Sequence, residues 1–168
     1  MRNTLTCLLV CGLLFPCALA AQSTSKATRD SLKTARIAHL VDTFYFRFSA
    51  DMALPMGGQT RHLTGGYYDL KVSKDTVVAY LPYYGRAYVA PMDPTKGGIE
   101  FTSKDFTYTT TARKKGGWDI SFQFKDAGDV KQMQLTVSTA GYASLQVTSI
   151  NRQSISFNGE VTGRKKRR

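Results

Sequence analysis

The residues best suited to contact a ligand gather in one short stretch, Tyr80 to Tyr88, which reads YLPYYGRAY. Tyrosine rings can stack on a sugar ring or on a guanidinium, and arginine offers a planar set of donors to carboxylates, phosphates and hydroxyls. Arg152 lies in a second polar segment, Asn151-Arg152-Gln153. We therefore predict a non-enzymatic binding domain for a glycan, a lipid-like molecule or a protein partner. The predicted binding site is composed of Tyr80, Tyr83, Tyr84, Arg86, Tyr88 and Arg152.

The same residues also have a purely structural interpretation, because aromatic side chains mostly serve packing and polar tripeptides often form turns. Pro82 removes a backbone donor and Gly85 permits positive φ, so the stretch cannot be an uninterrupted central strand. We expect a bend or bulge near a sheet edge that divides the side chains between core and surface: Leu81 and one of Tyr83 and Tyr84 buried, Arg86 and Tyr88 exposed.

Enzyme chemistry has a weaker basis. Catalysis of hydrolysis requires a nucleophile with a base, or paired carboxylates, and no such constellation stands out. His62 lies in a glycine-rich loop, Gly57 to Gly66, which allows close approach of a ligand. A hydrolase that uses His62 or a carboxylate is therefore the alternative to a binding protein, and a purely structural interaction module is a third possibility. No metal-loop, P-loop or dinucleotide pattern is present, so we predict no metal, nucleotide or cofactor.

The first residues have the pattern of a signal peptide. Arg2 supplies a positive charge, Leu5 to Phe15 is apolar, and Ala18-Leu19-Ala20 is a small-x-small cleavage site. We predict a leader over residues 1–21 and export to the periplasm or beyond. All three cysteines lie in this leader, so the mature chain would have neither disulfides nor thiolate chemistry. A lipid anchor on Cys17 is the alternative.

Charge is concentrated at the C-terminus. The net charge is +11, and residues 163–168 form a basic tail. Such a run is either a solvated tail or a segment that adheres to an anionic surface. The residues concerned are Arg164, Lys165, Lys166, Arg167 and Arg168.

The remaining chain, residues 22–162, predicts one mainly β domain with an N-terminal helix. Ser25 to about Asp42 lacks glycine and proline, and its apolar residues near the C-terminal end recur with helical spacing. From Phe44 onward the apolar period changes to two, and short turns separate about eight strands. We predict an α+β fold in which the helix packs on a strongly curved antiparallel meander, open or partly closed into a barrel.

Several motifs in this order resemble a family of bacterial envelope proteins, domain of unknown function 4251. The motifs are Asp51 to Gly58, YLPYYGRAY, Gly97 to Phe101, Lys115 to Trp118 and Asn151 to Gly159. The resemblance spans essentially Asp42 to Val161 and implies export and a mainly β domain. It implies no activity and no catalytic residues, and the basic tail is not part of it.

Overall fold

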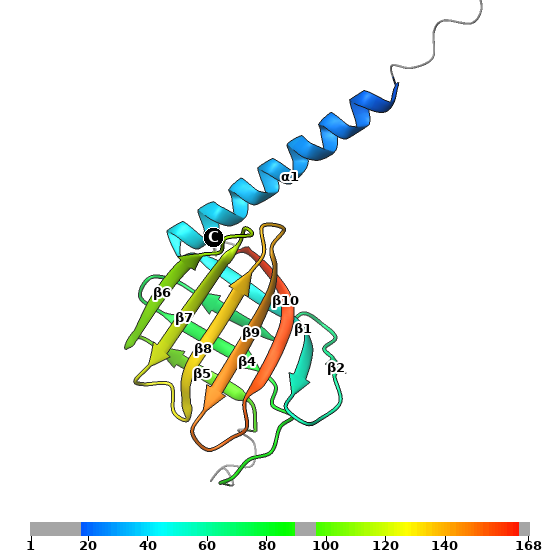
Figure 1. The fold of residues 1–168 in the computed structure, drawn as a ribbon. Helices are drawn as coiled ribbons and strands as arrows, with labels where there is room; N and C mark the ends of the chain where they lie inside the picture. The colour runs from blue at the N-terminus through cyan, green and yellow to red at the C-terminus, as the bar shows by residue number, and fades with distance from the viewer. Residues whose placement is uncertain (1–17, 90–96, 165–168) are drawn as a thin grey trace, which may run out of the picture.

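The computed structural model describes residues 18–89 and 97–164, which form one long helix and a ten-stranded antiparallel sheet (Figure 1). The helix α1 spans Ala18–Thr43. The strands are β1 (Phe46–Pro55), β2 (Arg61–His62), β3 (Asp69–Val72), β4 (Val77–Leu81), β5 (Ile99–Ser103), β6 (Phe106–Ala112), β7 (Trp118–Phe124), β8 (Val130–Val137), β9 (Tyr142–Ser149) and β10 (Ile155–Gly163).

The sheet curls into a nearly closed barrel. Its strand order is β5-β4-β3-β1-β10-β9-β8-β7-β6, and the two-residue β2 pairs with β1 beside this path. From β1 the chain runs through β3 and β4 to β5, which is one edge of the sheet. Lys104 and Asp105 connect β5 to β6, the other edge, and the following strands lead back to β10, which pairs with the other side of β1. The predicted mainly β fold with an N-terminal helix is confirmed, with ten strands rather than about eight.

Alternation of apolar and polar residues explains where the core lies. The largest fully buried side chains come from inward positions on both halves of the sheet, including Phe46 and Phe48 of β1, Phe122 of β7 and Phe157 of β10. Each such side chain removes enough apolar surface from water to contribute about 2 kcal/mol. The inside of the barrel is thus occupied mainly by hydrophobic side chains, and the groove described below lies on its outer surface.

The helix covers one end of the barrel with its last turns only. Ile37 and Val41 are buried against the sheet, whereas residues 26–33 are exposed and the helix projects beyond the barrel (Figure 1). The helix begins before the predicted Ser25, at Ala18. No described helix has both the length and the apolar character that crossing a membrane requires.

The helix ends at an unusual residue. Phe44 has a φ of 54°, a left-handed conformation that glycine commonly adopts at this position. Its N–H donates to the carbonyl of Val41, and the N–H of Tyr45 donates to the carbonyl of Leu40, which closes the last turn. The Phe44 ring is buried and stacks on Tyr108 of β6, with ring centroids 3.7 Å apart. Phe44 was predicted to begin the first strand; it instead caps the helix, and its packing holds the strained backbone.

Candidate functional site

The stretch Tyr80 to Tyr88 leaves the sheet at Pro82. Tyr80 is the outward-facing residue before the end of β4, and its ring stacks on Tyr68 at a centroid distance of 5.8 Å. Leu81, the last residue of β4, is buried. The strand therefore ends here rather than bending, and β4 lies between β3 and the edge strand β5, near the sheet edge as predicted. Proline explains the end, since it cannot donate to the ladder.

Tyr83 anchors the rest of the stretch to the loop between β9 and β10. Its hydroxyl donates to the carbonyl of Arg86 (2.8 Å) or that of Gln153 (3.0 Å), and the guanidinium of Arg152 lies 5.0 Å from its ring centroid. Ala87 and Arg152 form an isolated antiparallel bridge. Burial raises the pKa of Tyr83 above its ordinary value. One of Tyr83 and Tyr84 was predicted to be buried; Tyr83 is half-buried and Tyr84 is exposed. The contacts of Tyr83 are internal.

The predicted ligand donor Arg152 is occupied within the protein. Its Nε and Nη2 contact the two carboxylate oxygens of Asp129 at 2.6 and 2.8 Å, and its Nη1 donates to the carbonyls of Gly97 and Gly98. The carboxylate of Asp129 raises the pKa of Arg152. With four donor contacts made, this guanidinium holds loops together and has little capacity left for a ligand.

The other predicted site residues are exposed. Tyr84 is stacked by Arg61 of β2 at 4.9 Å, and Tyr88 is 65% exposed. The Arg86 side chain is exposed, while its backbone bonds to Gln153. Exposure of Arg86 and Tyr88 agrees with the sequence analysis. His62 is exposed on β2.

Among the described residues, no three His, Cys, Asp or Glu side chains are grouped to hold a metal ion. Cys17, Lys165, Lys166, Arg167 and Arg168 lie outside these residues, whereas Arg164 lies 4.8 Å from the Tyr45 ring centroid.

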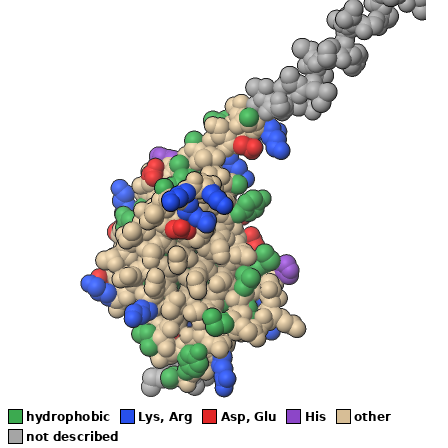
Figure 2. Space-filling view, viewed as in Figure 1, with side chains coloured by type: hydrophobic (Ala, Val, Ile, Leu, Met, Phe, Trp, Pro, Cys, Tyr) green, Lys and Arg blue, Asp and Glu red, His purple; other side chains and the backbone are tan. Residues whose placement is uncertain are grey.

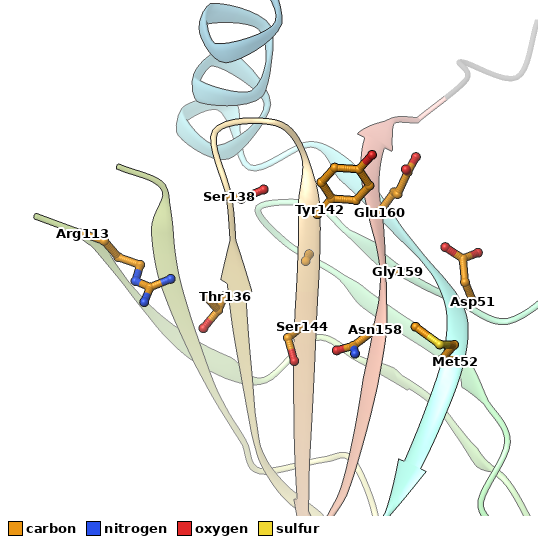
Figure 3. A pocket seen from close by; sticks show the side chains of 11 residues that line it. Asp51, Met52, Arg113, Thr136, Ser138, Tyr142, Ser144, Asn158, Gly159 and Glu160 are labelled. Atoms are coloured by element: carbon orange, nitrogen blue, oxygen red, sulfur yellow. The ribbon is translucent and has the colours of Figure 1, made fainter. Parts of the chain in front are cut away.

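A groove of about 490 Å³ lies elsewhere, on the outer face of the sheet across β1, β10, β9 and β8 (Figure 3). Its volume is in the range that binds small ligands. Thr136, Ser144 and Asn158 form a row across β8, β9 and β10, and Tyr142 and Glu160 lie above them near the helix. The other lining residues are Asp51, Met52, Arg113, Ser138, Ala143 and Gly159.

A bulge in β1 builds one wall of this groove. The register with β10 shifts between Ala50 and Met52, so two successive residues, Asp51 and Met52, both face outward. Bulges redirect side chains in this way and are frequent beside binding sites. Opposite the bulge stands Gly159, where a Cβ would overlap the carbonyl oxygen of Ser49. The missing side chain lets β1 approach β10 closely at this point.

The rim of the groove is held by contacts from neighbouring elements. At one end, Asp119 accepts a hydrogen bond from Thr136 (2.7 Å) and lies 3.5 Å from the Nε of Arg113. At the other end, Tyr142 is 61% exposed, and the ammonium of Lys33 on α1 lies 5.6 Å from its ring centroid. The groove therefore offers one accessible aromatic ring among hydroxyl, amide and carboxylate groups.

Beyond the groove, the outer face of β6 to β10 is polar with very few charges. Its rows consist mainly of Thr, Ser, Gln and Asn, and the exceptions among the outward positions are Asp119, Lys131, Tyr142 and Glu160. In Figure 2 the centre of this face is accordingly tan, with charged side chains toward its margins. For a chain of net charge +11, such a face is unusual, and we define it as the polar face.

Sequence reasoning missed this groove. Its residues come from strands far apart in the chain, and each strand alone reads as ordinary alternation. A usable signal was Asn158-Gly159-Glu160, since glycine inside a strand marks a bulge or a close backbone approach.

Comparison with known proteins identifies the family. A profile described as "Domain of unknown function (DUF4251)" matches residues 28–161. The chain belongs to this family. The match covers α1 from Thr28 to its C-terminal end and nearly the whole sheet, and it ends before the basic tail.

A solved structure supports the fold. It is the crystal structure of a DUF4251 family protein from Bacteroides eggerthii, with a TM-score of 0.60, 17% sequence identity, and coverage of 81% of this chain and 91% of that one. No curated protein matches the chain. At 17% identity the similarity supports a shared fold and gives no information about a ligand.

Proposed function

We propose that this DUF4251 domain is an exported binding protein whose outer groove holds part of a neutral glycan. The observation that carries the proposal is the composition of the groove: one exposed tyrosine ring, Tyr142, beside hydroxyl and amide side chains, on a floor formed at Ala143 and Gly159. A sugar presents an apolar ring face and many hydroxyls, and these two features match an aromatic ring and short polar side chains.

The polar face extends this argument beyond one sugar unit. Serine, threonine, asparagine and glutamine side chains both donate and accept hydrogen bonds, as sugar hydroxyls do. The row of Asn158, Ser144 and Thr136 reaches Asp119 on β7 and Thr111 on β6. The next row along the strands consists of neutral polar residues alone: Ser156, Gln146, Gln134, Ser121 and Thr109. A neutral polymer could lie along these rows without bringing a charge close to the basic protein.

Binding fits the groove better than catalysis does. Among the described residues that line the groove there is no histidine that could act as a base, since His62 is not one of them. The guanidinium of Arg113, which does line the groove, is paired with Asp119. One feature nevertheless favours a second candidate, glycoside hydrolysis: two carboxylates, Asp51 and Glu160, line the same groove. In that case the substitutions Asp51→Asn and Glu160→Gln would each abolish cleavage of a glycan while leaving its binding.

Ligand-observed NMR tests the proposal. Saturation transfer is measured from the protein to neutral oligosaccharides: cello-, manno-, xylo- and chito-oligosaccharides. We expect transfer to at least one of them, and we expect Tyr142→Ala or Asn158→Ala to remove most of it, since loss of a stacking ring costs about 1 kcal/mol.

The matched control is Tyr67→Ala. Tyr67 is 74% exposed but is not a lining residue of the groove. Equal transfer with wild-type and Tyr142→Ala protein would place the ligand elsewhere, and the edge with Tyr84, Arg86 and Tyr88 would be the next surface to test. No transfer to any of the oligosaccharides would refute the neutral-glycan assignment.

Export and attachment to an anionic surface are part of the same proposal. Export is supported by the signal-peptide pattern of the first residues. Adhesion to an anionic surface is supported by the run of positive charges in the basic tail. N-terminal sequencing of the exported protein should give Ala21 or Gln22, whereas a lipid-modified Cys17 would replace this with a membrane anchor.

A further inference from the structure

Strand β6 is an uncovered edge of the sheet. Among the described residues it pairs with β7 alone, and it forms the border of the sheet in Figure 1. All of its residues except Phe106 are exposed, including Tyr108 at 43%. The inner face of this strand is partly covered where Tyr108 stacks on Phe44, whereas its outer face and its free edge are accessible.

The backbone groups that point away from β7 can be identified from the ladder. The N–H of Lys125 donates to the carbonyl of Asp105, and the N–H of Arg113 donates to the carbonyl of Gly117, both at 3.0 Å. In an antiparallel pair, the backbone N–H and C=O of every second residue bond to one neighbouring strand, and those of the residues between them point to the other side. Odd-numbered residues of β6 thus bond to β7. The free edge presents the N–H and C=O groups of Phe106, Tyr108, Thr110 and Ala112.

This edge lacks the features that usually protect an exposed strand. Natural edges carry charges, proline or bulges that prevent pairing with another chain. Strand β6 reads FTYTTTA and has none of these, and its threonines and aromatics favour β structure. The opposite edge, β5, is shorter and carries Glu100. The sheet is accordingly open to addition of a strand at β6.

We propose that β6 pairs antiparallel with β6 of a second copy of this chain, with Thr109 on the two-fold axis. This register uses every free backbone group: Phe106 faces Ala112 of the second copy, and Tyr108 faces Thr110. Shifting the centre to Tyr108 or Thr110 leaves some of these groups unpaired. The register therefore follows from the positions of the donors and acceptors.

Side chains agree with this register. On the outer face, threonine meets threonine, because Thr107 faces Thr111 of the second copy, and threonine pairs are favourable across strands. On the other face, the exposed ring of Tyr108 gains contact with Thr110. Just beyond the ladder, Asp105 faces Arg113 with opposite charge. Lys104 and Lys114 face each other one residue farther out, which limits the ladder to β6 itself.

Dimerisation would join two polar faces into one. Because the two-fold axis is perpendicular to the sheet, the outward positions Thr107, Thr109 and Thr111 continue into the same positions of the second copy. The inference stands independently of the glycan proposal, since it rests on backbone groups of β6 and not on the groove.

The proposal is tested by introducing a positive or a negative charge at Thr109, the residue on the two-fold axis. Thr109 points outward and is exposed, so Thr109→Lys and Thr109→Glu leave the fold intact. Sedimentation velocity over a wide range of protein concentration should show a wild-type dimer. Each variant alone should dimerise at least about ten-fold more weakly, because like charges meet on the axis, and an equal mixture of the two should regain the dimer.

The matched control is Thr148→Lys, an exposed outward position on the central strand β9, which should dimerise as wild type does. Thermal melting of each variant verifies folding. A wild-type protein that is monomeric throughout, or a Thr109→Lys variant that dimerises normally, would overturn the proposal. If the monomeric wild type instead captures a synthetic peptide of residues 106–112, the edge serves an extended strand of another protein.

Discussion

The guanidinium of Arg152 and the carboxylate of Asp129 meet in a two-point contact, Nε to Oδ2 at 2.6 Å and Nη2 to Oδ1 at 2.8 Å. Arg152 lies in the loop between β9 and β10, and Asp129 immediately precedes β8. Through its Nη1 the same guanidinium also binds the carbonyls of Gly97 and Gly98, just before β5. One side chain therefore joins three segments at the end of the barrel opposite the helix (Figure 1).

Replacing Arg152 by lysine should destabilise the domain by about 1–3 kcal/mol. Lysine keeps the charge but cannot make the two-point contact or reach both glycine carbonyls. The loss is below that of a fully buried pair because the two side chains retain 15% and 22% exposure. Urea unfolding measures it. Arg86→Lys, at an exposed guanidinium of the neighbouring segment, is the control and should change stability by less than about 0.5 kcal/mol.

Tyr83→Phe should alter how stability depends on alkaline pH. Burial, the first cause, raises the pKa of Tyr83 above its ordinary 10.0 in the folded protein. The folded state then holds this proton more tightly than the unfolded state does, so the stabilisation is complete below pH 10 and is lost as pH rises through the folded pKa. The unfolding free energies of wild type and variant should therefore converge above pH 10. A constant difference would contradict this account.

Asp126 should give the opposite dependence, at acidic pH. Its carboxylate accepts hydrogen bonds from the hydroxyl of Ser103 and from the N–H groups of Lys104 and Asp105. These bonds, the Ser103 hydroxyl first, lower the pKa of Asp126. Its contribution is present above the ordinary value of 3.8 and disappears as pH falls through the folded pKa. Melting temperatures of wild type and Asp126→Asn should differ at pH 7 and converge in acid.

That contact also bears on the free edge. Asp126 follows β7, whereas the residues that it binds form the connection between β5 and β6. Loss of this anchor in Asp126→Asn should increase amide hydrogen exchange at Lys104 and Asp105 relative to the centre of β7. Unchanged exchange there would show that the connection is held by other contacts.

Local alternation allowed most of the fold to be predicted. The clearest case is Trp118 to Phe124, where Ile120, Phe122 and Phe124 are buried as their spacing indicated. Phe44 was misplaced because its apolar character fits both the helix stripe and the strand, and the choice depends on a tertiary contact with Tyr108. Local pattern carries no information about such a partner.

Less of the candidate site was accessible from the sequence. Tyr83 and Arg152 were predicted as ligand-binding residues because they lie in clusters of tyrosine, arginine and polar residues. In the structure, both side chains make their hydrogen bonds to other parts of the protein. The groove depends instead on which strands become neighbours, and above all on β10 closing against β1 at the bulge beside Asp51. Pairing between strands about a hundred residues apart is set by the whole sheet, so the residues of one strand cannot reveal it.

Gly159→Ala should be among the most damaging single substitutions in the sheet. An added Cβ would overlap the carbonyl oxygen of Ser49 and crowd the Cα of Ala50, both backbone atoms of β1. Because backbone cannot rotate away, the β1–β10 ladder must separate, and we expect a loss of at least about 3 kcal/mol or failure to fold. Urea unfolding measures this loss. Gly97→Ala is the control, since its Cβ would meet no atom within 4 Å. Equal stability of the two variants would show that β1 does not approach β10 as closely as described, and the floor of the proposed groove would then need a different account.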